Sequence, residues 1–287
     1  KSSTLPSSSG ATLVDLNMPI VYPGDVQEAI DLGRHAIAMS RACGVWPGLK
    51  IVESVADGSG TVELHGERID PGRPTMEIAG RRWVPRPTGN LLTPYTRDLE
   101  REFLEVRLVL AREYAVLNKL NQIAVRGPND WLGIVSTGYT YHETLEALRM
   151  LGFGSDDDLR AAGIRLFRLG MPIPLDPGQV REFAQGLAQV VVVEEKAQNL
   201  EWTVKDALYG RTDAPVVYGK RAPDDSPLFP LIGAMEADTI APILRRCLEP
   251  RLAARMTLPP PPPRELIPLS VARTPHYCSG CPHNRST

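Results

Sequence analysis

This sequence has few cysteines, almost no net charge and no long apolar runs. Its 287 residues include 4 cysteines, and 32 basic against 34 acidic side chains give a net charge of −2. Four cysteines are too few for a disulfide scaffold, and a reducing, cytoplasmic location is predicted. The balanced charge predicts neither a nucleic-acid partner nor a membrane surface. No apolar run approaches the roughly 20 residues that a membrane-spanning helix needs.

Motifs of several common enzyme classes are also missing. The sequence has no HExxH zinc motif, no Ser–His–Asp signature and no complete GxGxxG loop. His35, His65 and His142 are scattered, without a carboxylate or nucleophile at a diagnostic spacing, so we predict that each is a surface or capping residue. What is present is ordinary globular usage, with 43% hydrophobic and 23% charged residues, over a length typical of about two domains.

Residues 131–220 show the most regular pattern in the chain. Strands are predicted at 131–135, 164–169, 189–194 and 216–219, with helices between them near 141–152, 177–188 and 201–209. Pro177 suits the first helical position, which makes Asp176 the expected N-cap. Strands that alternate with short helices predict an α/β fold, with a mostly parallel sheet covered on both faces.

The first part of the chain has the pattern of half an α/β unit. A short strand is predicted at 19–23 and another at 49–55, with a helix between them that ends near Gly44. Asp25 is a good N-cap for this helix, and Glu28 completes a capping box. We expect exposed apolar surface on residues 1–58, and therefore association with another surface.

The rest of the chain is less regular. Glycine and proline are frequent over 57–97, where short strands are predicted at 61–64 and 82–84. An amphipathic helix is predicted over 98–125 and a shorter helix over 237–248. The five prolines at 259–263 predict an extended spacer between domains, with an SH3-type ligand as the alternative.

Two polar stretches follow predicted strands at one edge of the sheet. Ser136, Thr137 and Gly138 lead into a helix, where backbone N–H groups and the helix dipole can hold an anion. A purely structural turn is the alternative. Glu194 and Glu195 end another strand, and carboxylates at such edges face ligands in open α/β sheets. A solvated charge cluster is the alternative there.

The sharpest local motif is the pair Cys278 and Cys281, which is flanked by His276 and His283. Two thiolates at this spacing suit one edge of an iron–sulfur cluster, half a zinc site or a redox dithiol. The alternative is a turn with two free thiols. Cys43 and Cys247 lie in apolar helical patterns, and we predict that both pack as small hydrophobes.

Several motifs together resemble the fused indolepyruvate:ferredoxin oxidoreductases, within the 2-oxoacid:ferredoxin oxidoreductase family. They occur in the family's order over most of the chain: KSSTLPS at 1–7, YPGDVQE at 22–28, LKIV at 49–52 with VADG at 55–58, GIVSTG at 133–138, VEEK at 193–196 and CSGCPH at 278–283. Each motif is weak alone, and their order and spacing carry the resemblance.

The resemblance implies a thiamine-diphosphate enzyme that uses Mg²⁺. Such enzymes decarboxylate an aryl-2-oxo acid, pass electrons through [4Fe–4S] clusters to ferredoxin and form an acyl-CoA from coenzyme A. Lys1, Ser2, Ser3 and Thr4 form a polar, cationic stretch that can contact a substrate carboxylate or a phosphate, with a disordered terminus as the alternative. These four residues, with Ser136, Thr137 and Gly138, are the predicted cofactor contacts. The resemblance also implies cluster ligation by Cys278 and Cys281, although Pro282-His283 departs from the pattern of the relatives.

The resemblance also implies a domain order. Residues 1–58 correspond to the rear part of a thiamine pyrimidine-binding domain and 59–97 to a connecting segment. Residues 98–220 correspond to a transketolase C-terminal-like domain, 221–270 to a proline-rich linker and 271–287 to the start of the diphosphate-binding domain. We therefore expect an internal piece of a larger enzyme, a homodimer in its complete form.

On this interpretation the chain alone is inactive and holds neither iron nor thiamine diphosphate. Its catalytic residues cannot be named from this sequence. Two alternatives stay open: a scaffold piece of another thiamine enzyme, of the pyruvate or transketolase type, and a non-catalytic α/β assembly module.

Overall fold

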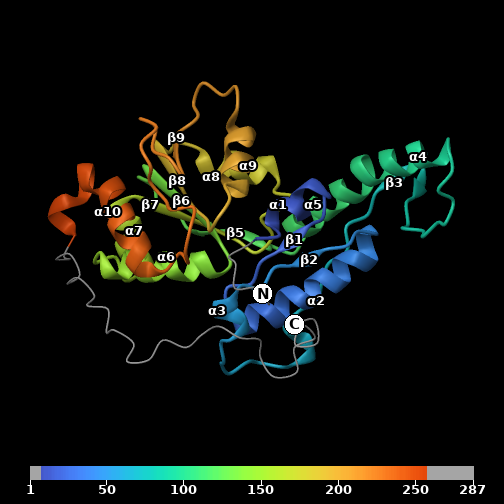
Figure 1. Cartoon of the computed structure of the whole chain (residues 1–287), viewed down its shortest axis with the longest axis horizontal. Helices are drawn as coiled ribbons and strands as arrows, with labels where there is room; N and C mark the ends of the chain where they lie inside the picture. Colours follow the sequence, from blue (N-terminus) through green and yellow to red (C-terminus); the bar gives the residue numbers. More distant parts are fainter. Residues whose placement is uncertain (1–7, 257–287) are drawn as a thin grey trace, which may run out of the picture. The chain divides into compact units, whose positions relative to one another are not determined.

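A computed structural model describes residues 8–256, which lie in one compact unit of the chain. Its main feature is a five-stranded sheet in the order β5-β7-β6-β8-β9 (Figure 1). The strands are β5 (Asn121–Val125), β6 (Leu132–Thr137), β7 (Ile164–Leu169), β8 (Gln189–Val193) and β9 (Val216–Tyr218). Strands β6 to β9 are parallel and β5 is antiparallel to β7. The predicted α/β class with a mostly parallel sheet is confirmed.

Helices cover both faces of this sheet. On one face lie α8 (Pro177–Ala184) and α9 (Asn199–Leu208). On the other lie α6 (Tyr139–Met150) and α7 (Asp156–Ala162), and α10 (Ala237–Leu252) packs on α6, followed by η3 (Ala253–Arg255) (Figure 1). The Asp176 carboxylate accepts the Gln179 N–H at the start of α8, which confirms the predicted cap.

The core beneath α8 and α9 consists of alternate residues of the central strands. It contains Val135, Phe167, Leu169, Val190 and Val192 from the sheet, packed against apolar side chains of α8 and α9. Successive strand residues point to opposite faces, so Gly133 lies on this face too. A Cβ at Gly133 would come within 2.5 Å of Phe183 and Leu187, so this glycine lets α8 approach the sheet closely.

The N-terminal segment, residues 8–58, packs beside this sheet. It comprises α1 (Gly10–Asp15), the parallel strands β1 (Ile20–Val21) and β2 (Gly48–Leu49), α2 (Val26–Cys43) and α3 (Glu53–Ala56). Asp25 accepts the Glu28 N–H, as predicted, whereas Glu28 accepts from the N–H of Gly24. Trp46 is 81% exposed and Ile37 57% exposed, which confirms the expected apolar surface.

The predicted strand at 49–55 is wrong beyond Leu49. Lys50 donates its N–H to Val21, and the chain then leaves the ladder and begins α3 at Glu53. No strand forms at 61–64 in the described part of the chain, where η1 (Gly66–Arg68) follows. The strand expected at 82–84 is β4 (Arg81–Arg82), paired with β3 (Glu77–Ile78) in a hairpin.

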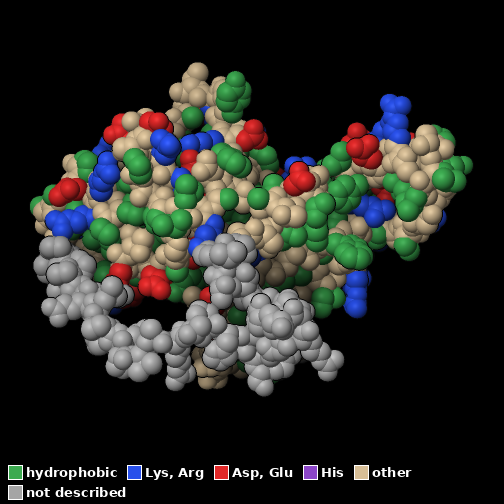
Figure 2. Space-filling model, viewed as in Figure 1, with side chains coloured by type: hydrophobic (Ala, Val, Ile, Leu, Met, Phe, Trp, Pro, Cys, Tyr) green, Lys and Arg blue, Asp and Glu red, His purple; other side chains and the backbone are tan. Residues whose placement is uncertain are grey.

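The helix predicted over 98–125 is also partly wrong. It consists of α4 (Tyr95–Glu102), the π-helix η2 (Phe103–Arg107) and α5 (Leu108–Leu117), and residues 121–125 form β5 instead. Ile123 continues the helical apolar stripe, but its segment pairs with β7. Lys119, with φ +53, turns the chain between helix and strand. Exposed hydrophobic side chains, including Ile78, Val84, Leu91 and Tyr95, gather around α4 and the hairpin (Figure 2).

Candidate functional site

The carboxyl ends of β6 and β8 meet at the topological switch point of the sheet. The chain passes from β6 to β7 on one side through α6 and α7, and then crosses to β8 on the other side through α8. Ligands of open α/β sheets bind in the crevice at such a point. Both polar stretches predicted from the sequence, 136–138 and 194–196, lie there.

Ser136, Thr137 and Gly138 are tightly packed. The Thr137 hydroxyl donates to the Leu169 carbonyl at 2.7 Å, and the Thr140 hydroxyl donates to the Thr137 carbonyl at 2.8 Å. Gly138 has φ +52, and a Cβ there would come within 2.4 Å of the Tyr22 ring. Any cofactor group at this turn would share its space with that ring. The cofactor role of these three residues stays a prediction.

Glu194 is buried, so the alternative of a solvated charge cluster is wrong for this residue. Its carboxylate caps α9, where it accepts the N–H groups of Leu200 and Glu201, both at 2.9 Å. Burial raises the pKa of Glu194 to about 7, opposed by these two donors and by the charge of Lys220.

A pocket lies beside Glu194, between the sheet edge and the N-terminal segment. Thr137, Glu194 and Glu195 form its sheet side, and Tyr22 and Lys50 come from the N-terminal segment. The Lys50 ammonium lies 4.1 Å from the centroid of the Tyr22 ring, whose hydroxyl donates to Glu195 at 3.4 Å. Burial lowers the pKa of Lys50, an effect opposed by Glu195 and Glu194.

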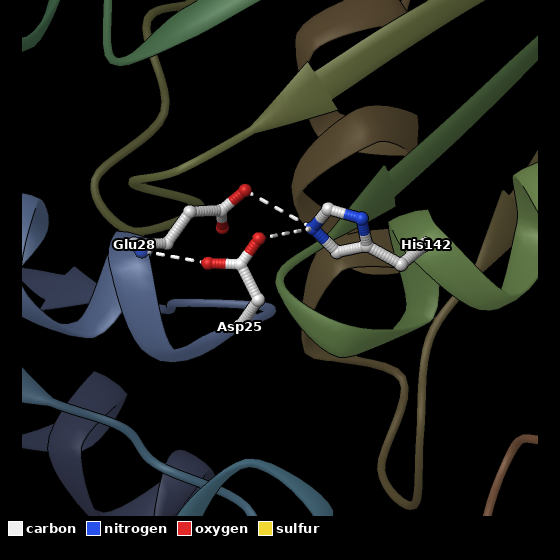
Figure 3. Close-up of side chains that lie close together, drawn as sticks. All are labelled: Asp25, Glu28 and His142. Atoms are coloured by element: carbon white, nitrogen blue, oxygen red, sulfur yellow. Dashed lines mark hydrogen bonds and ion pairs between the residues drawn. The ribbon is translucent and has the colours of Figure 1, made fainter. Parts of the chain in front are cut away.

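A second polar cluster joins α2 to the same edge of the sheet (Figure 3). The Glu28 carboxylate lies 3.0 Å from His142 Nε2, at the start of α6, and also pairs with Arg168 at the end of β7. The second carboxylate, Asp25, lies 3.9 Å from the same His142 nitrogen. The expectation for His142 misses this contact, because Glu28 is 114 residues away in the sequence.

Asp25, Glu28 and His142 are of the types that hold divalent metals, and their ligand atoms lie within 4.8 Å of one another. The Arg168 guanidinium already supplies a positive charge at Glu28. The cluster therefore connects the N-terminal segment to the sheet without needing an ion.

Replacing Glu28 with glutamine is expected to destabilise the chain by about 1.5–3 kcal/mol, because it removes hydrogen bonds to a charged group. Burial opposes ionisation of Glu28, but the His142 hydrogen bond and the Arg168 charge outweigh it and lower its pKa. The stabilisation is complete above the unfolded-state pKa of about 4.3 and is lost as the pH falls through the lower folded-state pKa. Denaturant unfolding of both proteins between neutral and acid pH measures this difference.

The matched control for that substitution is Glu146→Gln, which breaks an exposed pair with Arg149. It should cost at most about 1 kcal/mol. A Glu28→Gln effect no larger than the control, or one that grows in acid, would contradict the assigned role.

The described cysteines are separate and buried. Cys43 lies in α2 and Cys247 in α10, both as free thiols, and burial raises the pKa of Cys43 to about 12 and that of Cys247 to about 11. Their predicted role as packing residues is confirmed. Lys1, Ser2, Ser3 and Thr4, and Cys278 and Cys281, lie outside the described residues.

Residues 122–256, from β5 to the end of α10 and η3, match the family model of the indolepyruvate oxidoreductase domain. These residues are therefore similar to indolepyruvate oxidoreductase domains, and the resemblance seen in the motifs is confirmed. The curated relatives that the chain matches are indolepyruvate oxidoreductase subunits IorA. The chain is 28% identical to that of Methanothermobacter thermautotrophicus over 93% of its own length, and 27% identical to that of Pyrococcus abyssi over 71%.

The match covers only part of these relatives, 38% of the first protein and 30% of the second. Among solved structures, a split-gene transketolase in an inactive β4 tetramer aligns over 81% of this chain and 57% of its own, with TM-score 0.44 and 16% identity. A 2-oxoglutarate:ferredoxin oxidoreductase from Magnetococcus marinus aligns over 80% and 42%, with TM-score 0.45 and 12% identity.

The helices of residues 8–256 include none with the length and apolar character required to span a membrane.

Proposed function

We propose that this chain is part of an IorA-type subunit of an indolepyruvate-type 2-oxoacid:ferredoxin oxidoreductase. The observation that carries the proposal is the match to IorA subunits over 93% of the chain, together with the domain match over residues 122–256. The complete enzyme oxidatively decarboxylates an aryl-2-oxo acid to an acyl-CoA and passes the electrons to ferredoxin. We further propose that it is a cytoplasmic homodimer of such subunits.

Within that enzyme, the described residues supply scaffold rather than the reacting groups. Thiamine diphosphate, when bound with Mg²⁺, supplies the carbanion chemistry of decarboxylation. In the described part of the chain, the turn at Gly138 is packed against Tyr22. The candidate metal-ligand cluster there contains no cysteine, which a [4Fe–4S] cluster requires. We therefore assign [4Fe–4S] ligation to Cys278 and Cys281, and cofactor contact to Lys1–Thr4 together with other parts of the subunit.

The domain assignment follows from the same proposal. Residues 1–58 belong to the pyrimidine-binding domain, 98–220 to the transketolase C-terminal-like domain and 271–287 to the diphosphate-binding domain, with connecting segments at 59–97 and 221–270. The contact between Glu28 and His142 is then a contact between two domains of the enzyme.

The complete enzyme tests the proposal. The full-length protein is assayed with indolepyruvate, coenzyme A and a viologen dye. Dye reduction that requires thiamine diphosphate and coenzyme A is expected, and pyruvate and 2-oxoglutarate serve as comparison substrates. Absence of thiamine-dependent reduction would overturn the proposal, and a preference for pyruvate would place the enzyme in the pyruvate-type branch.

The 287-residue chain by itself is expected to hold no iron and no thiamine diphosphate, and to show no turnover. Four ligands are needed for a [4Fe–4S] cluster, and Cys278 and Cys281 supply two thiolates. Metal analysis and the visible absorbance spectrum of the purified chain measure this. A brown preparation with bound iron would contradict the expectation.

A further inference from the structure

The pocket at the switch point has two kinds of wall. Its polar side contains Lys50 and Glu195, which come from different parts of the chain. Its apolar side is formed by small and medium hydrophobic residues: Val14, Ile20, Pro172, Ile173 and Leu200. The pocket opens to solvent at its mouth.

Lys50 brings a positive charge that feels the charges of Glu195 and Glu194 but forms no direct ion pair among the described residues. Its ammonium lies over the Tyr22 ring, at 4.1 Å from the centroid, and within residues 8–256 it forms no ion pair. A lysine ammonium has three N–H donors, and a partly buried ammonium is costly unless it is paired. The pocket therefore offers an anionic group a favourable position at Lys50.

Glu195 brings the opposite charge to the same pocket. One of its oxygens accepts from the Tyr22 hydroxyl at 3.4 Å and the other from the Met235 N–H at 3.1 Å. A carboxylate has about four acceptor positions, so Glu195 can accept further donors. Glu194 differs, because both of its oxygens already cap α9.

We propose that this pocket binds a small zwitterion, an α-amino acid with a short apolar side chain. Its carboxylate pairs with Lys50, its ammonium pairs with Glu195, and its side chain lies against the apolar wall. A simple anion would pair only with Lys50, and a simple cation only with Glu195. A ligand that carries both charges satisfies both residues.

The ligand would touch both the N-terminal segment, through Lys50, and the sheet edge, through Glu195. Binding to a site built from both parts stabilises their contact, because the ligand favours the state in which they are together. Amino-acid binding in this pocket does not require the oxidoreductase chemistry of the proposed function.

Binding to the 287-residue chain is measured by calorimetry and by thermal unfolding. The probes are L-alanine and L-valine, with N-acetyl-L-alanine, L-alanine methyl ester, acetate, methylammonium and inorganic phosphate as comparisons. The free amino acids are expected to bind saturably with Kd of about 1 mM or lower and to raise Tm. The two blocked alanines, each lacking one charge, should bind at least about 30-fold more weakly, as expected for a lost buried charge pair.

Two substitutions locate the site. Lys50→Met and Glu195→Gln should each weaken amino-acid binding about 30-fold or more, whereas the exposed Lys119→Met should leave it unchanged. The blocked alanines test the same charges in the unaltered protein, so the proposal stays testable if a variant does not fold. It is overturned if no amino acid binds, if phosphate or acetate binds as tightly, or if the blocked alanines bind like the free amino acid.

Discussion

Replacing Arg165 with methionine is expected to lower the free energy of unfolding of the 287-residue chain by about 3–5 kcal/mol. Arg165 lies on β7 beneath α8 and pairs with Asp130 at 2.9 Å, with both side chains almost fully buried. Its guanidinium also donates to the carbonyls of Phe183 and Gln185, just where α8 ends. The substitution leaves the Asp130 charge and both carbonyls without their partner in the interior.

Denaturant unfolding of the wild type and the variant measures this loss. The control is Arg160→Met on α7, which removes a guanidinium paired with the exposed residues Asp156 and Asp157 and should cost at most about 1 kcal/mol. Adding Asp130→Asn to Arg165→Met removes the stranded charge and should recover part of the loss. A loss below about 1 kcal/mol for Arg165→Met would mean that the buried pair of Arg165 and Asp130 stabilises the fold no more than an exposed ion pair does.

Local patterns in the sequence predict much of the sheet. The strand predicted at 164–169 is β7 at the predicted bounds, and the Asp176–Pro177 pair starts α8 as expected. Both signals act over a few residues and need no distant partner. The same patterns fail where a contact with a distant part of the chain determines the secondary structure. Residues 121–125 continue the apolar stripe of a helix, but they form a strand because they pair with β7.

For the candidate site, too, the sequence predicts local features but not contacts between distant parts of the chain. The sequence places 136–138 and 194–196 at one sheet edge, because the α/β pattern predicts parallel strands, whose carboxyl ends lie at the same edge. It does not reveal that Glu194 is buried, or that Glu28, Lys50 and Tyr22 reach this edge from the N-terminal segment. Those contacts depend on how the segment packs on the sheet, which no short-range spacing encodes.

Tyr22 and Gly138 form the centre of that packing. Tyr22 is 2% exposed and donates its N–H to the Gly170 carbonyl beyond β7, while its ring lies against Gly138 beyond β6. Gly24 is equally close to the same turn, because a Cβ there would lie 2.6 Å from the Gly138 carbonyl oxygen. The contact between the N-terminal segment and the five-stranded sheet therefore has no room for added side-chain atoms.

Gly138→Ala is accordingly expected to destabilise the chain by about 2–6 kcal/mol. Gly138 has φ +52 and ψ −131, a conformation that side chains disfavour by about 1–3 kcal/mol. The added Cβ would also lie 2.4 Å from the Tyr22 ring, and overpacking of this kind costs a further 1–3 kcal/mol or so. Thermal and denaturant unfolding measure the total.

Gly186→Ala separates these two causes. Gly186 also has positive φ, +76, but no atom lies within 4 Å of a Cβ built there, so the backbone cost of about 1 kcal/mol should act alone. A double-mutant cycle that combines Gly138→Ala with Tyr22→Leu should show coupling, because the smaller leucine side chain relieves the clash with the added methyl group. Equal losses for the two glycine variants, with no coupling to Tyr22, would mean that the N-terminal segment does not pack on this turn.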